Sequence, residues 1–260
     1  MQSMFANYHW VLSLITGFSI IAVTMLMNRL MARVATFRNA KQVNKESFAR
    51  KMERPNYAAV HRRNHKWAAL YLSVIFGLLL PFCLTAASQP WWRIPRDVVV
   101  ILMVYDFLYY FTHRYLFHDN GVLGGPLLQM HAVHHRQHNP CRGDSNYLHP
   151  LEIAIGLGLY VATIFILSRF MGNFKVATIV ITWVVYTELN LHNHDLWDAD
   201  HFPFKTFHAA SKLHHFHHIR FTGGNFATIS PLYDWLFGTL DHGKGYRAEM
   251  KGLQPKAGKP

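Results

Sequence analysis

Long apolar stretches constrain the fold of this chain more than any other feature. Hydrophobic residues make up 51% of its 260 residues and charged residues only 15%, and the charged residues are kept apart from the apolar stretches. A soluble domain carries about a quarter charged residues. Inside a bilayer every backbone N–H and C=O has to be paired within the protein, which an α-helix achieves on its own. The sequence therefore predicts an all-α, polytopic membrane protein with four to five membrane-embedded helices. The stretches cover residues 9–27, 67–87, 98–112, 150–167 and 176–191.

The distribution of basic residues predicts how these helices are oriented. Residues 28–66 hold eleven Lys/Arg and two Glu, which favours a cytoplasmic loop after an N-out anchor, with an interfacial helix around 48–57. Two further helix pairs then return the chain to the same side, whether residues 150–191 form two spans or a re-entrant hairpin. That side carries 22 of the 26 Lys/Arg and every histidine cluster. We therefore interpret the net charge of +12 as a sign of topology and expect no nucleic-acid partner.

Histidine is the second unusual feature, because 16 of the 19 histidines lie at or after residue 113. Two triples have the spacing i, i+3, i+4, which places three side chains on one face of a helix. His113 and His118 are five residues apart, so they converge only if the helix ends or loosens between them. The two triples are His131, His134 and His135, and His214, His217 and His218.

The number of clustered imidazoles predicts two metal ions, because a zinc site usually takes four ligands. No thiolate stands among them, and nitrogen-rich ligation with open positions suits iron that activates oxygen. We expect two iron ions, with zinc as a substitute in purified protein. We expect lesser roles for His138, His208 and His215, with His138 the best extra ligand of the three. His61 and His65 lie among arginines and lysines that would repel a cation.

Asp106 lies two helical turns before His113, within an apolar stretch. An acid in such a place is a functional-site hypothesis by default. It either packs against a neighbouring helix as a hydrogen-bonded residue or orients a ligand imidazole.

Taken in order, these motifs resemble the fatty acid hydroxylase/sterol desaturase superfamily over roughly residues 97–241. The resemblance rests on H-x4-H, H-x-x-H-H and a terminal H-x-x-H-H, together with their flanking residues. The flanking matches are Asp106, Asn139-Pro140, His149-Pro-Leu-Glu152, Gly224-Asn225-Phe226 and Tyr233-Asp234-Trp235-Leu236-Phe237-Gly238-Thr239.

The resemblance implies a membrane base with a cytoplasmic histidine-rich cap that holds a di-metal site and oxidises a lipid C–H bond with O2. Members of the superfamily carry a further histidine pair before the last box. Here His192 is the expected ligand, with His194 as the alternative, and Glu188 stands where another histidine is expected. Glu188 is either a direct metal ligand or a residue that orients His192. The metal set is thus His113, His118, His131, His134, His135, His192, His214, His217 and His218, with Asp106 and Glu188 as catalytic candidates.

The function expected on this basis is hydroxylation of a fatty-acyl or sterol-like lipid, with desaturation or sterol methyl oxidation as the alternative. A membrane metal-binding or transport protein is a remote alternative, because the histidines lie beyond the ends of the spans. The chain shows no Gly-rich dinucleotide fingerprint and no cytochrome domain. Electrons from NAD(P)H are therefore expected through a separate cytochrome b-type protein, or a ferredoxin with its reductase.

The sequence divides into three predicted regions: membrane anchor helices with the basic loop (1–96), a di-iron catalytic domain (97–242) and a loose basic tail (243–260). The expected location is the endoplasmic reticulum for a eukaryotic protein or the inner membrane for a bacterial one, with the metal site on the cytoplasmic side. The oligomeric state stays open.

Overall fold

The computed structural model describes residues 7–118, 121–197, 199 and 201–245, and within them the protein is built from helices without a β-strand. The prediction of an all-α fold is confirmed. The predicted tail 243–260 lies almost entirely outside the described residues. The α-helices are α1 (Trp10–Met31), α2 (Ala35–Met52), α3 (Pro55–Val74), α4 (Arg93–Thr112), α5 (Leu128–His135), α6 (Pro150–Met171), α7 (Val176–His192), α8 (Phe204–Ile219) and α9 (Leu232–Leu236).

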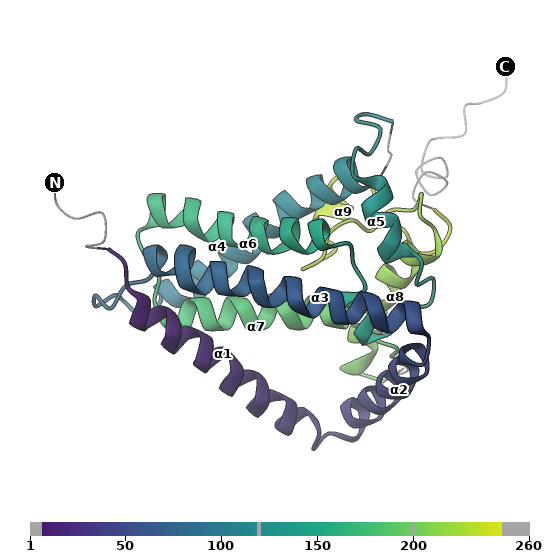
Figure 1. The fold of residues 1–260 in the computed structure, drawn as a ribbon, viewed down its shortest axis with the longest axis horizontal. Helices are drawn as coiled ribbons and strands as arrows, with labels where there is room; N and C mark the ends of the chain where they lie inside the picture. Colours follow the sequence, from purple (N-terminus) through teal and green to yellow (C-terminus); the bar gives the residue numbers. More distant parts are fainter. Residues whose placement is uncertain (1–6, 119–120, 198, 200, 246–260) are drawn as a thin grey trace.

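Three of these helical segments are long and apolar enough to cross a membrane: α1, α6, and α3 with its continuation to Cys83. All five predicted apolar stretches are largely helical, although the helix in the second ends at Cys83, α4 carries more charge and α7 is shorter than a typical span. Helix α7 packs against α1 and α4, and α4 packs against α6 (Figure 1). The core between them contains a cluster of aromatic rings: Tyr160 and Tyr186 stack at 4.6 Å, and Tyr105 meets Tyr186 edge-on at 5.0 Å.

The predicted interfacial helix over residues 48–57 is wrong, because two separate helices meet there. Helix α2 ends at Met52 and α3 begins at Pro55, whose fixed φ and missing N–H suit the first position of a helix. The basic segment is also tied to the histidine region. Asn44 of α2 donates to the carbonyl of Leu196, and its side-chain oxygen accepts from the N–H groups of Leu196 and Arg142. This segment is therefore part of the histidine cap and not a free loop.

The two ends of the helical bundle are built from different segments of the chain. At one end the carbonyl of Phe174 accepts from the N–H of Thr85 and its N–H donates to the carbonyl of Cys83, and Gln89 donates to the carbonyl of Asn173. At the other end lie α2, α5 and α8 (Figure 1). The structure thus agrees with the prediction that the histidine clusters share one side.

Asp106 anchors a distant loop. Its side chain is fully buried in α4 and accepts hydrogen bonds from the backbone N–H groups of Thr228 (2.8 Å), Ile229 (2.9 Å) and Ser230 (3.2 Å). It makes no hydrogen bond with an imidazole within the described part of the chain. Of the two interpretations of Asp106, the structure therefore supports a hydrogen-bonded packing residue.

We predict that Asp106→Ala destabilises the protein by about 2–4 kcal/mol, because buried N–H groups would lose a charged acceptor. Thermal unfolding in detergent micelles measures this loss, and Asp106→Asn, which keeps one acceptor oxygen, should lose less. A variant as stable as the wild type but deficient in metal would instead favour a role in orienting a ligand.

A second prediction concerns topology. A cysteine at Ser88 should react with a membrane-impermeant maleimide in intact cells, whereas a cysteine at Lys45 should react only after the membrane is opened. Both positions are exposed, and the native Cys83 and Cys141 are buried. The reverse labelling pattern would place the histidines on the outer side.

Candidate metal centre

The first histidine box depends on a local change of helix type. Helix α4 passes into a five-residue π-helix, His113–Phe117, in which the N–H of His118 donates to the carbonyl of His113 at 3.1 Å. His118 itself leaves the helix with extended backbone angles. The prediction that the helix loosens between these two histidines is confirmed. Short π-helical turns are frequent at functional sites.

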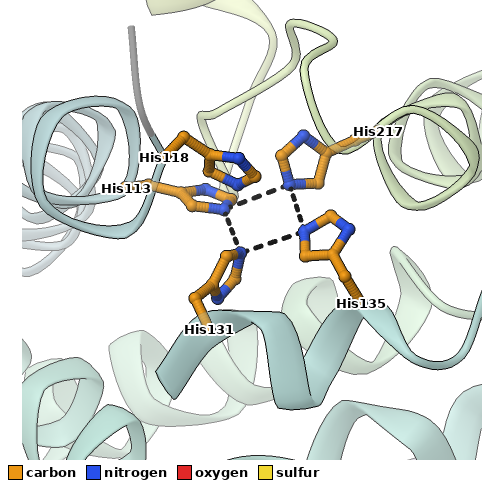
Figure 2. Close-up of side chains that lie close together, drawn as sticks. All are labelled: His113, His118, His131, His135 and His217. Atoms are coloured by element: carbon orange, nitrogen blue, oxygen red, sulfur yellow. Dashed lines mark hydrogen bonds between the residues drawn. The ribbon is translucent and has the colours of Figure 1, made fainter. Parts of the chain in front are cut away.

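Five buried histidines from three segments surround one point (Figure 2). We call them the five-histidine group. Their ring nitrogens approach closely: the Nε2 atom of His131 lies 3.0 Å from that of His113 and 3.0 Å from that of His135, and the Nε2 atom of His217 lies 3.1 Å from both His113 and His135. The group consists of His113, His118, His131, His135 and His217.

The hydrogen bonds of the outward-facing Nδ1 atoms show which tautomers are present. Nδ1 of His113, His118 and His217 each lies 2.7–2.8 Å from a backbone carbonyl, those of Phe226, Phe221 and Gly224 respectively. A carbonyl only accepts, so each Nδ1 carries the proton and each Nε2 presents a lone pair to the centre.

Facing lone pairs cannot bond to one another, and the buried Nε2 of His118 has no hydrogen-bond partner in the described residues. A cation between the rings would satisfy all of them. The residues present therefore fit a metal ion.

A four-histidine group lies directly beside the first and consists of His134, His194, His214 and His218. Nε2 of His194 lies close to the Nε2 atoms of all three other members: 3.0 Å from that of His134, 3.1 Å from that of His214 and 3.2 Å from that of His218. Its Nδ1 donates to the carbonyl of Asn190 at 3.0 Å. The adjacent residues His134 and His135 of α5 belong to different groups, so one turn of helix joins the two sites.

Burial keeps these imidazoles neutral. Removal from water lowers the pKa of His134 and of His217 to about 4, and it lowers the pKa of His194 well below its usual range. A neutral imidazole is the form that binds a metal. Both groups are therefore ready to act as ligands at neutral pH.

His192 was the expected ligand, and the structure places it outside both groups. Helix α7 ends at His192, whose Nδ1 lies 3.2 Å from the carboxylate of Asp195 and whose Nε2 lies 2.9 Å from the carbonyl of Phe207. The chain turns after this helix end, and the turn directs His194 into the four-histidine group instead. The alternative left open by the sequence is the one that the structure adopts.

Glu188 also lies outside both groups. Its carboxylate forms an ion pair with Arg142, which binds Asp195 at 3.0 Å as well. Within the described part of the chain this carboxylate bonds to Arg142 and to no imidazole, so the structure supports neither of the two interpretations made from the sequence. By binding both Glu188 and Asp195, Arg142 connects α7 to the loop that carries His194.

Among the described residues, the other candidate histidines His138, His208, His215 and His65 belong to neither group. His61 is buried, but its ring packs against Phe48 and Tyr57.

The sequence interpretation missed the function of Glu152. Its Oε1 lies 2.7 Å from Nδ1 of His131, and its Oε2 is buried without a partner in the described residues. Glu152 therefore orients a ligand imidazole, which is the role that the sequence suggested for Asp106. An acid at the start of an apolar stretch was the available signal.

A cavity of about 300 Å³ opens onto both groups. Its remaining wall comes mainly from α3, α4, α6 and α7 and is mostly apolar and aromatic, with Leu72, Tyr109, Leu157 and Trp183 among its residues. The histidines that line it are His113, His131, His134, His194 and His214.

Comparison with known proteins agrees with this geometry. The chain is 26% identical to methylsterol monooxygenase 1 of Rattus norvegicus over 179 residues, which cover 64% of this chain and 56% of that protein. It is 29% identical to the very-long-chain aldehyde decarbonylase GL1-11 of Oryza sativa subsp. indica over 176 residues, covering 65% and 60%. The matched part is thus little more than half the length of these relatives. No solved structure matches the chain. The family model "Fatty acid hydroxylase" matches residues 98–239, which hold both histidine groups, and the chain therefore belongs to the fatty acid hydroxylase family.

Proposed function

We propose that this protein is a membrane-bound di-iron monooxygenase that hydroxylates a C–H bond of a lipid with O2. The five-histidine group would hold one iron and the four-histidine group the other. Zinc can replace iron during purification, because open nitrogen sites also bind it. Relative to the set expected from the sequence, His194 replaces His192.

One observation carries this proposal: both histidine groups face a single, mostly apolar cavity. A site that only stores or transports a metal needs no apolar cavity against its ligands. A hydroxylase needs this space to bring an unreactive carbon next to the metal. The names of the relatives, a methylsterol monooxygenase and an aldehyde decarbonylase, support lipid-derived substrates.

The protein's own residues supply placement and exclusion of water. Nine imidazoles would hold the ions, and Glu152 keeps His131 in the orientation that directs its Nε2 to the centre. The apolar wall would keep water away from the reacting carbon. Iron bound by nitrogen ligands with open positions supplies the activation of oxygen.

The overall reaction requires reductant from outside the cavity. One oxygen atom of O2 enters the C–H bond as a hydroxyl group, and the other leaves as water, which consumes two electrons and two protons. We propose that the electrons come from NAD(P)H through a cytochrome b-type protein or a ferredoxin with its reductase, on the cytoplasmic side of the endoplasmic reticulum or of a bacterial inner membrane.

Desaturation or sterol methyl oxidation at the same site is the alternative outcome. Hydroxylation leaves a new oxygen on the lipid, whereas desaturation removes two hydrogen atoms and adds no oxygen. The decisive experiment compares lipid extracts from expressing and non-expressing cells grown under ¹⁸O2. We expect a lipid that is heavier by one labelled oxygen atom. Its absence, together with a new lipid that is lighter by two hydrogen atoms, would indicate a desaturase.

A matched pair of variants tests the assignment of the ligands. His194→Ala should remove the imidazole that lies near all three other members of the four-histidine group. The iron content should fall by about half, because one of two sites would be lost. His192→Ala should retain near wild-type iron, since His192 belongs to neither histidine group and its ring nitrogens lie against Asp195 and a backbone carbonyl. Metal analysis of the purified proteins measures both. If His192→Ala lost iron and His194→Ala kept it, our assignment of the fourth ligand would be wrong.

A further inference from the structure

The cavity beside the histidine groups is small for a lipid. Its volume of about 300 Å³ is at the lower end of the range for ligand pockets. Only part of a long lipid fits inside, so the remainder has to leave the cavity through its wall. The position of that exit decides which lipids reach the site.

The wall between α3 and α6 meets the requirements of an exit. Ala68 and Leu72 of α3 and Gly156 and Leu157 of α6 line the cavity, and none of the four is fully buried. Both helices belong to segments that are long and apolar enough to cross a membrane, so this wall would face hydrocarbon. An acyl chain that passes between them would exchange one apolar surrounding for another.

Gly156 is the residue of this wall that has no packing reason to be glycine. Glycine weakens a helix and in membrane helices usually permits close approach of a neighbour. Among the residues that the structure describes, no heavy atom outside its own stretch of helix lies within 4 Å of where a Cβ at residue 156 would stand. The space that a side chain would fill is open.

Gly158 on the same helix provides the comparison. It also has open space at its Cβ position, but it is exposed and does not line the cavity. Open space alone therefore does not distinguish Gly156, whereas its place on the cavity wall does. A side chain at 156 would narrow the cavity, and the same side chain at 158 would extend outward.

We propose that Gly156 keeps open a lateral passage between α3 and α6, through which the acyl chain of the substrate extends from the bilayer to the two histidine groups. The passage selects lipids with a slender, flexible chain. This inference deepens the proposed function and depends on it for the identity of the substrate, but not for the existence of the passage.

The test uses photolabelling of the full-length protein with a palmitic acid analogue that carries a diazirine near its terminal carbon. Labelled peptides are mapped by mass spectrometry. In the wild type we expect label at cavity residues such as Leu72 and Leu157. Gly156→Leu should lower this labelling by about tenfold or more, because its side chain would occupy the space that the acyl chain needs. Gly158→Leu should leave it unchanged.

Each other outcome also decides the matter. An unlabelled wild-type cavity, or equal labelling in Gly156→Leu and the wild type, would overturn the passage. If Gly156→Leu does not fold, as judged by its elution and iron content, Gly156→Ala replaces it. That variant adds a single methyl group and should lower the labelling by about threefold. Unchanged labelling in Gly156→Ala would again refute the inference.

Lipid oxidation is measured in the same preparations and separates this inference from the proposed function. Labelling that depends on Gly156 in a protein that forms no oxidised lipid would support the passage and contradict the monooxygenase. If the wild type and Gly156→Leu formed oxidised lipid equally and were labelled equally, the monooxygenase would be supported and the passage contradicted.

Discussion

The metal centre depends on three hydrogen bonds between histidine Nδ1 atoms and the backbone that follows α8. The carbonyls of residues 221, 224 and 226 accept from His118, His217 and His113 and so direct the lone pairs of these rings inward. The accepting segment is itself held by buried side chains. Asp234 accepts from the N–H groups of Phe226 and Ala227, and Asp106 accepts from the next three residues. A carboxylate deep in α4 thus stabilises the orientation of imidazoles that it never touches.

Much of this arrangement could be predicted from the sequence, because it follows from local periodicity. The spacing i, i+3, i+4 implies one helix face, and five residues between His113 and His118 imply a distorted helix. Apolar length implies membrane helices, and the basic residues imply a common side. These predictions need no knowledge of distant contacts. The structure agrees with the shared helix faces and the distorted helix, and three of the predicted membrane segments are long and apolar enough to span a bilayer.

Most of the errors have a different origin, because they concern residues whose roles depend on the position of a helix end or on a contact far away in the chain. His192 and His194 are separated by the end of α7, and where a helix ends within two residues is poorly determined by sequence. Glu188 was interpreted through its helical neighbour His192, but its partner Arg142 lies 46 positions away. Asp106 and Glu152 have similar sequence signals, an acid within an apolar stretch, and only the fold shows which of them meets an imidazole.

The position of Glu152 also bears on how the charge of two metal ions would be balanced among neutral ligands. Nine imidazoles contribute no charge, so two iron ions would leave a large positive charge in a buried site. The carboxylate of Glu152 is hydrogen-bonded to His131, and its second oxygen has no partner in the described residues. A buried carboxylate without a nearby cation is costly, and a cation without a nearby anion is costly too. Each would therefore offset the cost of the other, so that on our assignment the burial of Glu152 and the binding of metal stabilise one another.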